Sequence, residues 1–361
     1  MVTSSASVRP HLVWVPLTRR TFAASLPAFA AVPGMVSGAA RAEGTLLGQS
    51  APSLEDAFDA ASALPQLNAM IVALGGKVAL ARVLDGPGLD DPVNVKSASK
   101  TILSALVGVA IDRGVLTGVD QALGALIPDR IPAGADPRVA DITVGDLLSM
   151  RAGLQSTSGR GYGPWVVSDD WTAYALSRPM VAEPGGRMIY STGSSHLLSV
   201  ALTAASGRST LALARDWLGE PLGLAVPPWT RDPQGVFMGG NEMALSPRAL
   251  LAIGELYRNG GTRGGARVLP ASWVEESWRR RGRSRWTGAG YGYGWWLGRA
   301  GGEAVSYAWG YGGQMIYVVP SLGLTAVMTS DPDARGVDGH VQALHRLLAE
   351  RIVPAVRRMG S

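Results

Sequence analysis

The 361-residue sequence has no cysteine, four histidines and three lysines. The lack of cysteine excludes disulfides, thiolate zinc sites, cysteine nucleophiles and lipid anchoring through an N-terminal cysteine. The lysines are Lys77, Lys96 and Lys100, and arginine supplies nearly all of the remaining basic side chains. A lysine can lose its proton in suitable surroundings, which an arginine cannot readily do. Proton transfer by a basic side chain is therefore expected at few positions.

Charged residues are also scarce: they make up 17% of the chain, against 47% for apolar residues. Such a chain can bury a sizeable core, which excludes a disordered or fibrous protein. Its length fits one large domain or two intertwined ones. The sequence has no G-x-S-x-G, H-E-x-x-H or P-loop motif, so these signatures of hydrolases, zinc proteases and nucleotide-binding proteins are missing. No metal and no cofactor are expected.

Residues 1–42 predict a twin-arginine export signal. The pair Arg19–Arg20 stands directly before a mildly apolar, alanine-rich stretch over residues 23–36, and Ala40–Ala42 forms a small-x-small cleavage site. Such a signal is an address that is read and then removed. We therefore expect residues 43–361 to be the mature protein, exported to the periplasm or the cell exterior. A basic, disordered tail is the alternative.

The same segment accounts for most of the positive charge. The whole chain has a formal net charge of +5, and residues 1–42 contain four arginines and no acidic residue. Removal of the segment leaves +1, so a nucleic-acid partner is not expected. A stable membrane anchor is not expected either, because the apolar stretch is shorter than about 20 residues and contains Pro27 and Pro33.

Apolar strands near both ends of the mature chain flank a mainly helical region. Strands are expected over residues 67–74, 77–84, 293–297, 304–308, 315–319 and 324–329. Helices are expected over residues 53–64, 100–113, 144–150, 195–205 and 341–356. We therefore expect an α+β domain over 43–361. Its antiparallel sheet, flanked by helices, would come from about 43–120 and 236–361, with a helical insertion over about 121–235.

The tetrad Ser97-Ala98-Ser99-Lys100 stands at the start of an apolar helical stretch. A spacing of three places Ser97 and Lys100 on one helix face, so the ammonium group can reach the hydroxyl. The free N–H groups and the positive dipole end of a helix N-terminus also lie beside the serine. A serine hydroxyl is a poor nucleophile without such help. The tetrad predicts an activated nucleophile, with an ordinary capping serine as the alternative.

Tyr190 follows the Pro184–Gly186 turn and is the second candidate. Its phenol would act as a base near neutral pH if its pKa fell from about 10 to about 7, which requires about 4 kcal/mol. One cation at about 4 Å and an effective dielectric constant of about 20 supplies this energy. Lys100 alone therefore has the right strength, provided that burial does not oppose it. A core tyrosine is the alternative.

The segment Trp309–Gln314 is the third candidate, and it leads directly into an expected strand. Its glycines would let a strand approach a ligand closely. A backbone N–H such as that of Gln314 would then face an oxyanion. An ordinary β-turn is the alternative.

In this order, the three segments resemble the S-x-x-K, Y-x-N and K-T-G motifs of the serine β-lactamases and penicillin-binding proteins. The whole mature chain resembles the β-lactamase-related serine hydrolases, a class C-like group that also contains esterases, D-aminopeptidases and 6-aminohexanoate-dimer hydrolases. The supporting stretches are Ser97–Gly114, Ile142–Leu154, Tyr190–Gly207 and Gly310–Pro320. The resemblance implies the β-lactamase and penicillin-binding-protein fold.

The resemblance also implies a role for each candidate. Ser97 would be the acylated nucleophile, and Lys100 would assist its deprotonation. Tyr190 would relay the proton to the leaving group and then activate the water. The backbone N–H groups of Ser97 and Gln314 would form the oxyanion hole. We treat Lys100 and Tyr190 as a coupled pair, because either can be the base.

Two positions depart from the family motifs. Thr192 stands where Y-x-N has asparagine, and Tyr311 stands where K-T-G has lysine, followed by Gly312 and Gly313. We expect these four residues to bind substrate. In relatives that act on β-lactams, the asparagine and lysine help to hold the substrate amide and carboxylate. Their replacement favours a small ester or amide substrate over β-lactamase or D-Ala-D-Ala carboxypeptidase activity.

The stretch Gly161–Trp171 most resembles the 6-aminohexanoate-dimer hydrolase branch. The resemblance implies that Tyr162, Trp165 and Trp171 line the acyl pocket, with packing in an exposed loop as the alternative. Three other interpretations of the function remain open: a non-catalytic sensor of a cell-wall fragment or peptide, an acyltransferase, and a Ser-His-Asp hydrolase that uses His196. The last is the weakest, because His196 lies on an expected helix and is more simply a packed residue.

Overall fold

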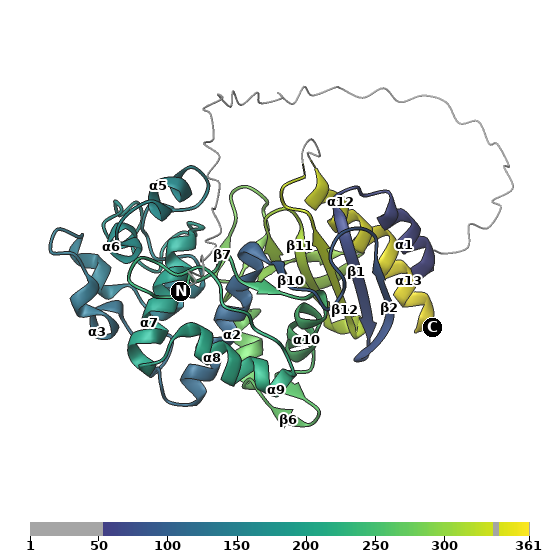
Figure 1. Cartoon of the computed structure of the whole chain (residues 1–361), viewed down its shortest axis with the longest axis horizontal. Coiled ribbons are helices and arrows are strands. Elements are labelled where there is room, and N and C mark those ends of the chain that lie inside the picture. The colour runs from purple at the N-terminus through teal and green to yellow at the C-terminus, as the bar shows by residue number, and fades with distance from the viewer. Residues whose placement is uncertain (1–52, 335–338, 361) are drawn as a thin grey trace, which may run out of the picture. The chain divides into compact units, whose positions relative to one another are not determined.

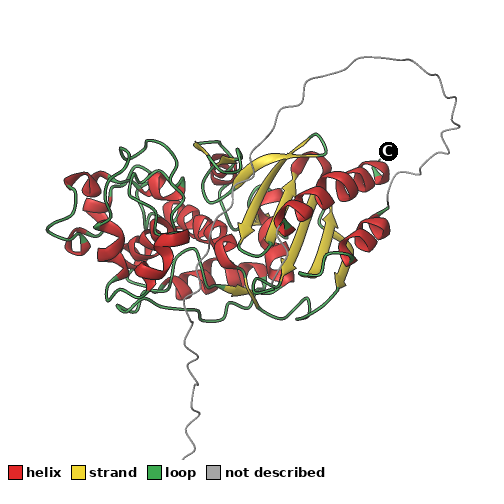
Figure 2. Cartoon of the chain, turned by 90° about the horizontal axis from the view of Figure 1, so that it is seen from above, coloured by secondary structure: helices red, strands yellow, loops and turns green. Residues whose placement is uncertain are grey.

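The computed structural model describes residues 53–334 and 339–360, so the export signal predicted over residues 1–42 lies outside the described residues. Figure 1 shows the sheet at one side of helix α2 (Ser99–Asp112) and the helical part of the domain at the other. The view from above in Figure 2 shows the same division, with helices packed against the sheet. The fold is α+β, as predicted.

The strands of the described chain form one large sheet and two small ones. Eight strands form an antiparallel sheet in the order β2-β1-β12-β11-β10-β9-β8-β7, and β3 pairs with β4 and β5 with β6. The strands are β1 (Leu67–Leu74), β2 (Lys77–Val83), β3 (Val93–Asn94), β4 (Ala244–Leu245), β5 (Thr262–Arg263), β6 (Ala266–Arg267), β7 (Gly282–Arg283), β8 (Gly290–Tyr291), β9 (Trp296–Ala300), β10 (Glu303–Gly310), β11 (Gln314–Val319) and β12 (Leu324–Ser330).

Between β3 and β4 the described chain is helical and irregular, without a strand. Besides α2, the α-helices are α1 (Leu54–Ser62), α3 (Leu123–Leu126), α4 (Val144–Leu148), α5 (Tyr162–Val166), α6 (Trp171–Leu176), α7 (Thr192–Ser206), α8 (Thr210–Ala214), α9 (Glu220–Leu222), α10 (Pro247–Arg258), α11 (Ala271–Ser277), α12 (His340–Leu347) and α13 (Val353–Met359). A single turn of π-helix joins α12 to α13, within the C-terminal helix predicted over 341–356.

The two ends of the described chain meet in the sheet. Strand β1 lies between β2 and β12, and residues 67–74 pair antiparallel with residues 324–330. All six strands predicted from apolar runs are present, although β9 begins at Trp296 rather than at Tyr293. The chain turns just before it, at Gly294, whose φ of 74° is left-handed. The two-residue strands β7 and β8, at one end of the sheet, were not predicted, because two residues carry no readable periodicity.

Both faces of the sheet are covered. Helices α1, α12 and α13 pack on one face, where they share a core with side chains of β1, β11 and β12. Helix α10 packs on the opposite face, against β11 and β12. The second core extends from that face through α2 into the helical part of the domain. Helix α2 is therefore enclosed by protein, which explains why its residues Ser99–Ala110 are all buried rather than only one face.

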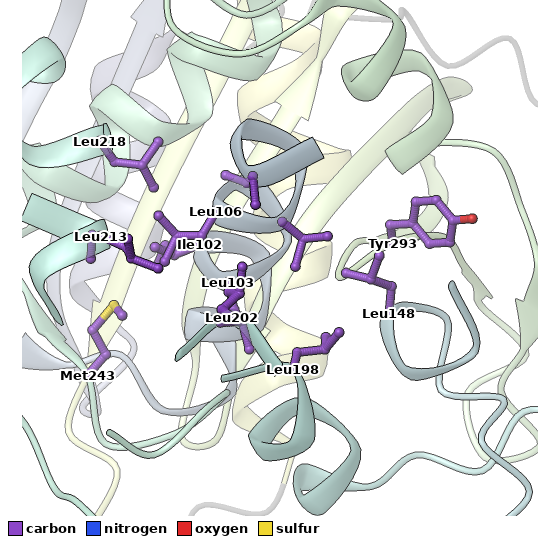
Figure 3. Packing of buried hydrophobic residues seen from close by; sticks show 14 of the residues in the cluster. Ile102, Leu103, Leu106, Leu148, Leu198, Leu202, Leu213, Leu218, Met243 and Tyr293 are labelled. Atoms are coloured by element: carbon purple, nitrogen blue, oxygen red, sulfur yellow. The ribbon is translucent and has the colours of Figure 1, made fainter. Parts of the chain in front are cut away.

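Figure 3 shows this second core around α2. Ile102, Leu103 and Leu106 of α2 point among side chains of α7 and of residues 213–218. Close packing between helices requires a small residue at some points, and Gly108 of α2 is one: a Cβ there would lie 2.5 Å from the Trp273 ring. This packing positions α2, and the 3₁₀ turn Lys96–Ala98, which contains Ser97, runs directly into that helix.

No single helix in residues 53–334 and 339–360 has the length and apolar composition needed to cross a membrane. One bent pair, Thr192–Ser206 with Thr210–Leu222, meets the length and composition criteria together.

We predict that Gly108→Val lowers the free energy of unfolding by about 1–3 kcal/mol, because the added side chain must displace the Trp273 ring. Valine and glycine differ little in helix propensity, so the change measures the packing itself. Urea unfolding followed by far-UV circular dichroism tests this. The matched control is Gly134→Val, where a Cβ would meet nothing within 4 Å; equal losses at both positions would contradict the prediction.

Candidate active site

Ser97 and Lys100 lie together at the start of α2. Ser97 is in the short 3₁₀ turn Lys96–Ala98, which runs directly into the helix. The Lys100 Nζ donates a hydrogen bond of 3.0 Å to the Ser97 Oγ. The spacing of three therefore places both side chains on one face, as helix geometry requires.

The Lys100 side chain is buried, with 3% of its surface exposed. Its Nζ also donates to the Gly240 carbonyl oxygen at 2.6 Å and to the Thr192 Oγ1 at 3.4 Å. No carboxylate contacts this ammonium group among the described interactions. Burial without a counter-charge disfavours the charged form, and it lowers the pKa of Lys100 from 10.5 to about 7. A large fraction of this lysine is therefore neutral at physiological pH.

Tyr190 lies on the other side of the same ammonium group. The Lys100 Nζ is 5.1 Å from the centroid of the Tyr190 ring, and the ring stacks on Trp296 of β9 at 5.5 Å. Burial raises the pKa of the Tyr190 phenol to about 12, against the opposing effect of a hydrogen bond with the Ser97 side chain. The condition that burial should not oppose Lys100 is therefore not met: burial outweighs the effect of a lysine that is itself only partly charged.

Thr192, in the asparagine position of Y-x-N, also lies in the site. It begins α7, and its Oγ1 hydrogen-bonds to the Ser158 Oγ at 2.9 Å and accepts from Lys100. Helix α7 has no local side-chain cap. Instead, Ser158 and Thr157 accept the N–H groups of Thr192 and Gly193 at 2.9 Å and 2.7 Å. A segment more than thirty residues earlier in the chain thus fixes the N-terminus of α7.

The residue before the serine has a strained backbone. Lys96 has a φ of 49°, which is left-handed and unfavourable for any residue with a side chain. Asn94 holds it there, because its Oδ1 accepts the Lys96 N–H at 2.9 Å and its Nδ2 donates to Glu242 at 2.7 Å. Glu242 also has a φ of 60° and lies 3.8 Å from the Lys96 ammonium group. Strain of this kind persists only where neighbouring contacts enforce it.

Gly240 and Glu242 belong to the loop over residues 239–243, which the sequence analysis did not single out. A Cβ at Gly240 would lie 2.5 Å from the Ser195 Cβ and 2.8 Å from the Lys100 Cγ, so only glycine brings this carbonyl to the ammonium group. The doublet Gly239–Gly240 between two apolar runs was a usable signal of close backbone approach. Tyr162, predicted to line the pocket, contacts this loop: the Asn241 Nδ2 donates to its hydroxyl at 2.7 Å.

The turn between β10 and β11 approaches the serine from the sheet. A Cβ at Gly310 would lie 2.2 Å from the carbonyl oxygen of Val95, two residues before Ser97. Gln314 is fully buried at the start of β11, and its side-chain amide donates to the Ser330 carbonyl and accepts the Ser330 N–H. No described hydrogen bond joins the Gln314 backbone to Ser97, so its part in an oxyanion hole stays a prediction.

The glycines of this turn have a structural purpose that the sequence analysis did not foresee. Gly312 and Gly313 have left-handed φ values of 79° and 103°. A Cβ at Gly312 would lie 2.4 Å from Pro332, and one at Gly313 would lie about 3 Å from Ser330 and His340. They therefore allow the turn to pack closely against protein, and the expectation that they bind substrate stays a prediction. The Tyr311 side chain, in contrast, is 72% exposed.

Trp165 and Trp171 are core residues. Both are buried, and the indole N–H groups of both donate to backbone carbonyls, at 2.9 Å and 3.1 Å. Their rings lie 5.4 Å apart and meet the His196 ring edge-on. The prediction that they line an acyl pocket is wrong, because both side chains are packed into the core against His196 of α7.

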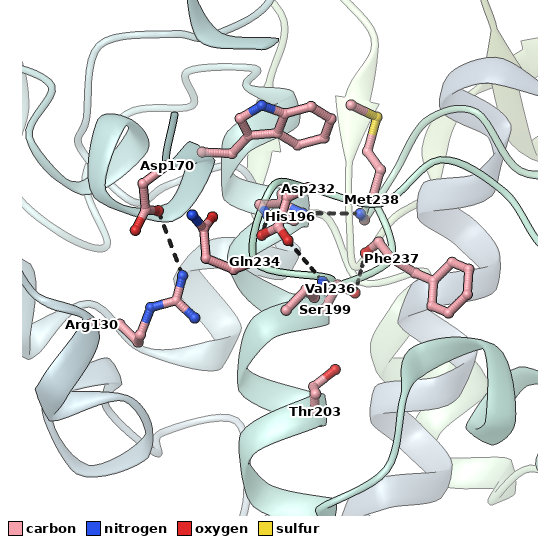
Figure 4. Close-up of polar contacts among 12 residues, drawn as sticks. Arg130, Asp170, His196, Ser199, Thr203, Asp232, Gln234, Val236, Phe237 and Met238 are labelled. Carbon is pink, nitrogen blue, oxygen red and sulfur yellow. Dashed lines mark hydrogen bonds and ion pairs between the residues drawn. The ribbon is translucent and has the colours of Figure 1, made fainter. Parts of the chain in front are cut away.

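His196 is held by its own partners. Figure 4 shows its ring beside Asp232, where the Nε2 lies 3.1 Å from the carboxylate, while its Nδ1 faces the Gly239 N–H at 3.4 Å. An N–H that donates to Nδ1 requires the proton on Nε2, so both nitrogens are occupied. Burial raises the pKa of Asp232, but contacts with His196 and the Val236 N–H outweigh it and the pKa is lowered overall. This pair supports the loop before Gly240.

The described residues contain no candidate metal site. No group of three or more histidine, aspartate or glutamate side chains there has the geometry to hold an ion.

Comparison with known proteins identifies the family. The model of the Beta-lactamase family matches residues 54–351. The chain belongs to this family. Its helical part and its antiparallel sheet are arranged as the family resemblance implied. A search of curated proteins gives no match.

Solved structures of the beta-lactamase fold resemble the chain at low sequence identity. A putative 6-aminohexanoate-dimer hydrolase from Bacillus anthracis has a TM-score of 0.69 at 16% identity and covers 86% of this chain and 83% of its own. EstCE1, a hydrolase with promiscuous acyltransferase activity, has a TM-score of 0.67 at 17% identity, and the match covers 82% of this chain and 97% of EstCE1. A D-stereospecific amidohydrolase from Streptomyces sp. has a TM-score of 0.64 at 19% identity, and the match covers 81% of this chain and 97% of the amidohydrolase. At such identities the likeness concerns the fold.

We predict that Lys96→Gly gives a more stable protein than Lys96→Ala by about 1 kcal/mol. Both changes remove the contact with Glu242, but only glycine adopts the left-handed φ of this position without a steric penalty. Thermal and urea unfolding of the two variants provide the measurement. Equal stability would mean that the backbone before Ser97 is not strained.

Proposed function

We propose that the protein is a serine hydrolase that cleaves a small ester or amide through an acyl-enzyme on Ser97. The observation that supports this most directly is the buried Lys100 ammonium group, 3.0 Å from the serine hydroxyl and with a pKa lowered to about 7. A neutral lysine at this distance can accept the serine proton, and a general base works best when its pKa lies near the working pH.

In the first step, neutral Lys100 takes the proton of the Ser97 hydroxyl while the Oγ attacks the carbonyl carbon of the substrate. The oxyanion that forms receives the Ser97 N–H and a second N–H from the β10–β11 turn, for which Gln314 is our assignment. The close approach of Gly310 to the Val95 carbonyl supports a role for this turn, because it brings the end of β10 to the serine.

In the second step, the leaving group needs a proton. Tyr190 is suited to supply it, since a phenol whose pKa is raised to about 12 is protonated at neutral pH and hydrogen-bonds with Ser97. The Lys100 ammonium group then returns its proton to the phenolate, which restores both groups to their starting states. In deacylation, the same pair takes a proton from water and returns it to Ser97.

Two features favour a small ester or amide over a β-lactam or a D-Ala-D-Ala peptide. Thr192 has no amide group to hold the substrate amide, and Tyr311 provides no cation for a substrate carboxylate. The structural relatives include proteins described as a putative 6-aminohexanoate-dimer hydrolase, a hydrolase with promiscuous acyltransferase activity and a D-stereospecific amidohydrolase, which accords with this choice. We further propose that the protein acts after export by its twin-arginine signal, in the periplasm or outside the cell.

Acyl transfer is a second candidate for the same site. An acyl-enzyme on Ser97 reacts with any nucleophile that reaches it, and one structural relative is described as a hydrolase with promiscuous acyltransferase activity. Added alcohol or amine acceptors would then divert the acyl group from the acid product to an ester or amide.

We predict that Ser97→Ala lowers hydrolysis of short-chain 4-nitrophenyl esters by at least about 1,000-fold, as loss of a nucleophile does in other serine hydrolases. A fluorophosphonate should add one adduct to the native protein and none to the variant, as measured by intact mass. Ser104→Ala, a buried serine on the same helix, is the control and should leave the adduct in place. Unchanged hydrolysis by Ser97→Ala would refute the proposal. No hydrolysis and no adduct on the folded native protein would also refute it, and would favour a sensor that binds without turnover.

We also predict that kcat/KM for a neutral ester rises with pH through about 7 and is constant above it. Only the deprotonated lysine can act as a base, so activity is lost as the pH falls below the lowered pKa of Lys100. Lys100→Arg should remove activity over the whole range, because arginine keeps its proton. A pH profile that is flat between about 5 and 9 would show that Lys100 is not the base.

A further inference from the structure

Two adjoining clefts lie along the edge strand β7. One, of about 460 Å³, is lined by Gly186–Met188 and Arg280–Arg283. The other, of about 520 Å³, is lined by Arg280, Arg283, Thr287–Gly290 and Leu297–Arg299. Because Arg280 and Arg283 line both clefts, the two form one continuous surface, which we call the β7 cleft. Each part is large enough for a small organic ligand.

The β7 cleft is strongly basic. Four exposed arginines line it: Arg187, Arg280, Arg283 and Arg299. Arg187, Arg283 and Arg299 donate to the backbone carbonyls of Val181, Gly288 and Gly302, and no described ion pair joins any of the four to a carboxylate. Arg299 has an acidic neighbour: besides hydrogen bonds from Arg357 and Ser321, its charge helps to lower the pKa of the Glu303 carboxyl. Arg281 differs, because Glu276 pairs with it. Guanidinium groups without a paired carboxylate, such as those of Arg280 and Arg283, attract an anion, and their planar forks suit carboxylate or phosphate.

The β7 cleft begins close to the catalytic pair. Met188 lines it, and a Cβ at Gly282 of β7 would lie 3.0 Å from the Met188 Cβ. Tyr190 follows two residues later, so its backbone is at most about 7 Å away. Tyr190 in turn hydrogen-bonds with Ser97 and packs on Tyr291 and Trp296, of the neighbouring strands β8 and β9. A substrate held at both places must extend from Ser97 past these aromatic side chains to the arginines.

We propose that the β7 cleft binds the anionic end, a carboxylate or phosphate, of a substrate whose ester or amide bond is cleaved at Ser97. This inference rests on the proposed function and names its substrate class. The cation that the family provides at the lysine of K-T-G is absent here, because Tyr311 takes that position. Arg280 and Arg283 of the β7 cleft would supply positive charge in its place. The preferred substrates are then longer acidic molecules rather than β-lactams.

A matched pair of esters tests the inference. The probes are 4-nitrophenyl hydrogen suberate, which has a free carboxylate, and its methyl ester, which does not. We expect the native protein to prefer the acidic ester. Arg280→Gln/Arg283→Gln should lower kcat/KM for it by about five-fold or more, mainly through KM, since one exposed ion pair contributes up to about a factor of five. The neutral ester should be unaffected, and added salt should weaken the preference.

The control variant is Arg263→Gln/Arg346→Gln, which removes the same charge from exposed positions outside the cleft. It should keep the preference for the acidic ester. If both double variants lower the rate equally, the effect is one of net charge and the inference is overturned. If the native protein hydrolyses both esters equally well, the inference fails while the proposed function stands.

A binding measurement separates the cleft from the chemistry. Hexanoate and hexyl phosphate are titrated into Ser97→Ala protein and into the same protein with Arg280→Gln/Arg283→Gln, with calorimetric detection. Saturable binding that the arginine changes abolish supports the inference even if no ester is hydrolysed, and the tighter ligand shows whether carboxylate or phosphate is preferred. Absence of arginine-dependent binding for both ligands overturns it.

Discussion

The candidate site depends on the burial of one ammonium group. Lys100 is surrounded by protein and has no carboxylate partner among its described contacts. An unpaired buried charge is costly, so the protein favours the neutral lysine, and that preference turns an ordinary side chain into a base. Arginine would not serve, since it keeps its proton. The need for a basic side chain that can lose its proton explains why this position has a lysine in a chain that otherwise uses mostly arginine.

Several segments that are distant in the sequence cooperate to produce this burial. Helix α2 is enclosed on all sides, so the lysine has no route to solvent along its own helix. The loop at Gly240 closes over it and offers a carbonyl oxygen, and the start of α7 brings Thr192. His196 and Asp232 hold that loop from behind, in an aromatic core with Trp165 and Trp171. His196 and Asp232 resemble part of a catalytic triad, but in this structure they support the loop that carries Gly240.

The same burial acts in opposite directions on the two ionisable partners. It lowers the pKa of Lys100 to about 7 and raises that of Tyr190 to about 12. Removing water disfavours the charged form of each group. Lysine is charged when it is protonated, whereas tyrosine is charged when it is deprotonated. A single environment therefore separates the roles: the lysine becomes the proton acceptor and the tyrosine the proton donor. This separation follows the general pattern by which active sites obtain both an acid and a base.

The sequence by itself determined the fold class, the main strands and the Ser97–Lys100 pair, because each depends on spacing within a short stretch of chain. A separation of three on a helix fixes which side chains share a face, and apolar runs fix where strands form. The tertiary structure alone decided the pKa of Tyr190, the burial of Trp165 and Trp171, and the contact of Gly240 with Lys100. These depend on which distant segments exclude water from a group, and water exclusion is a property of packing that local sequence does not contain.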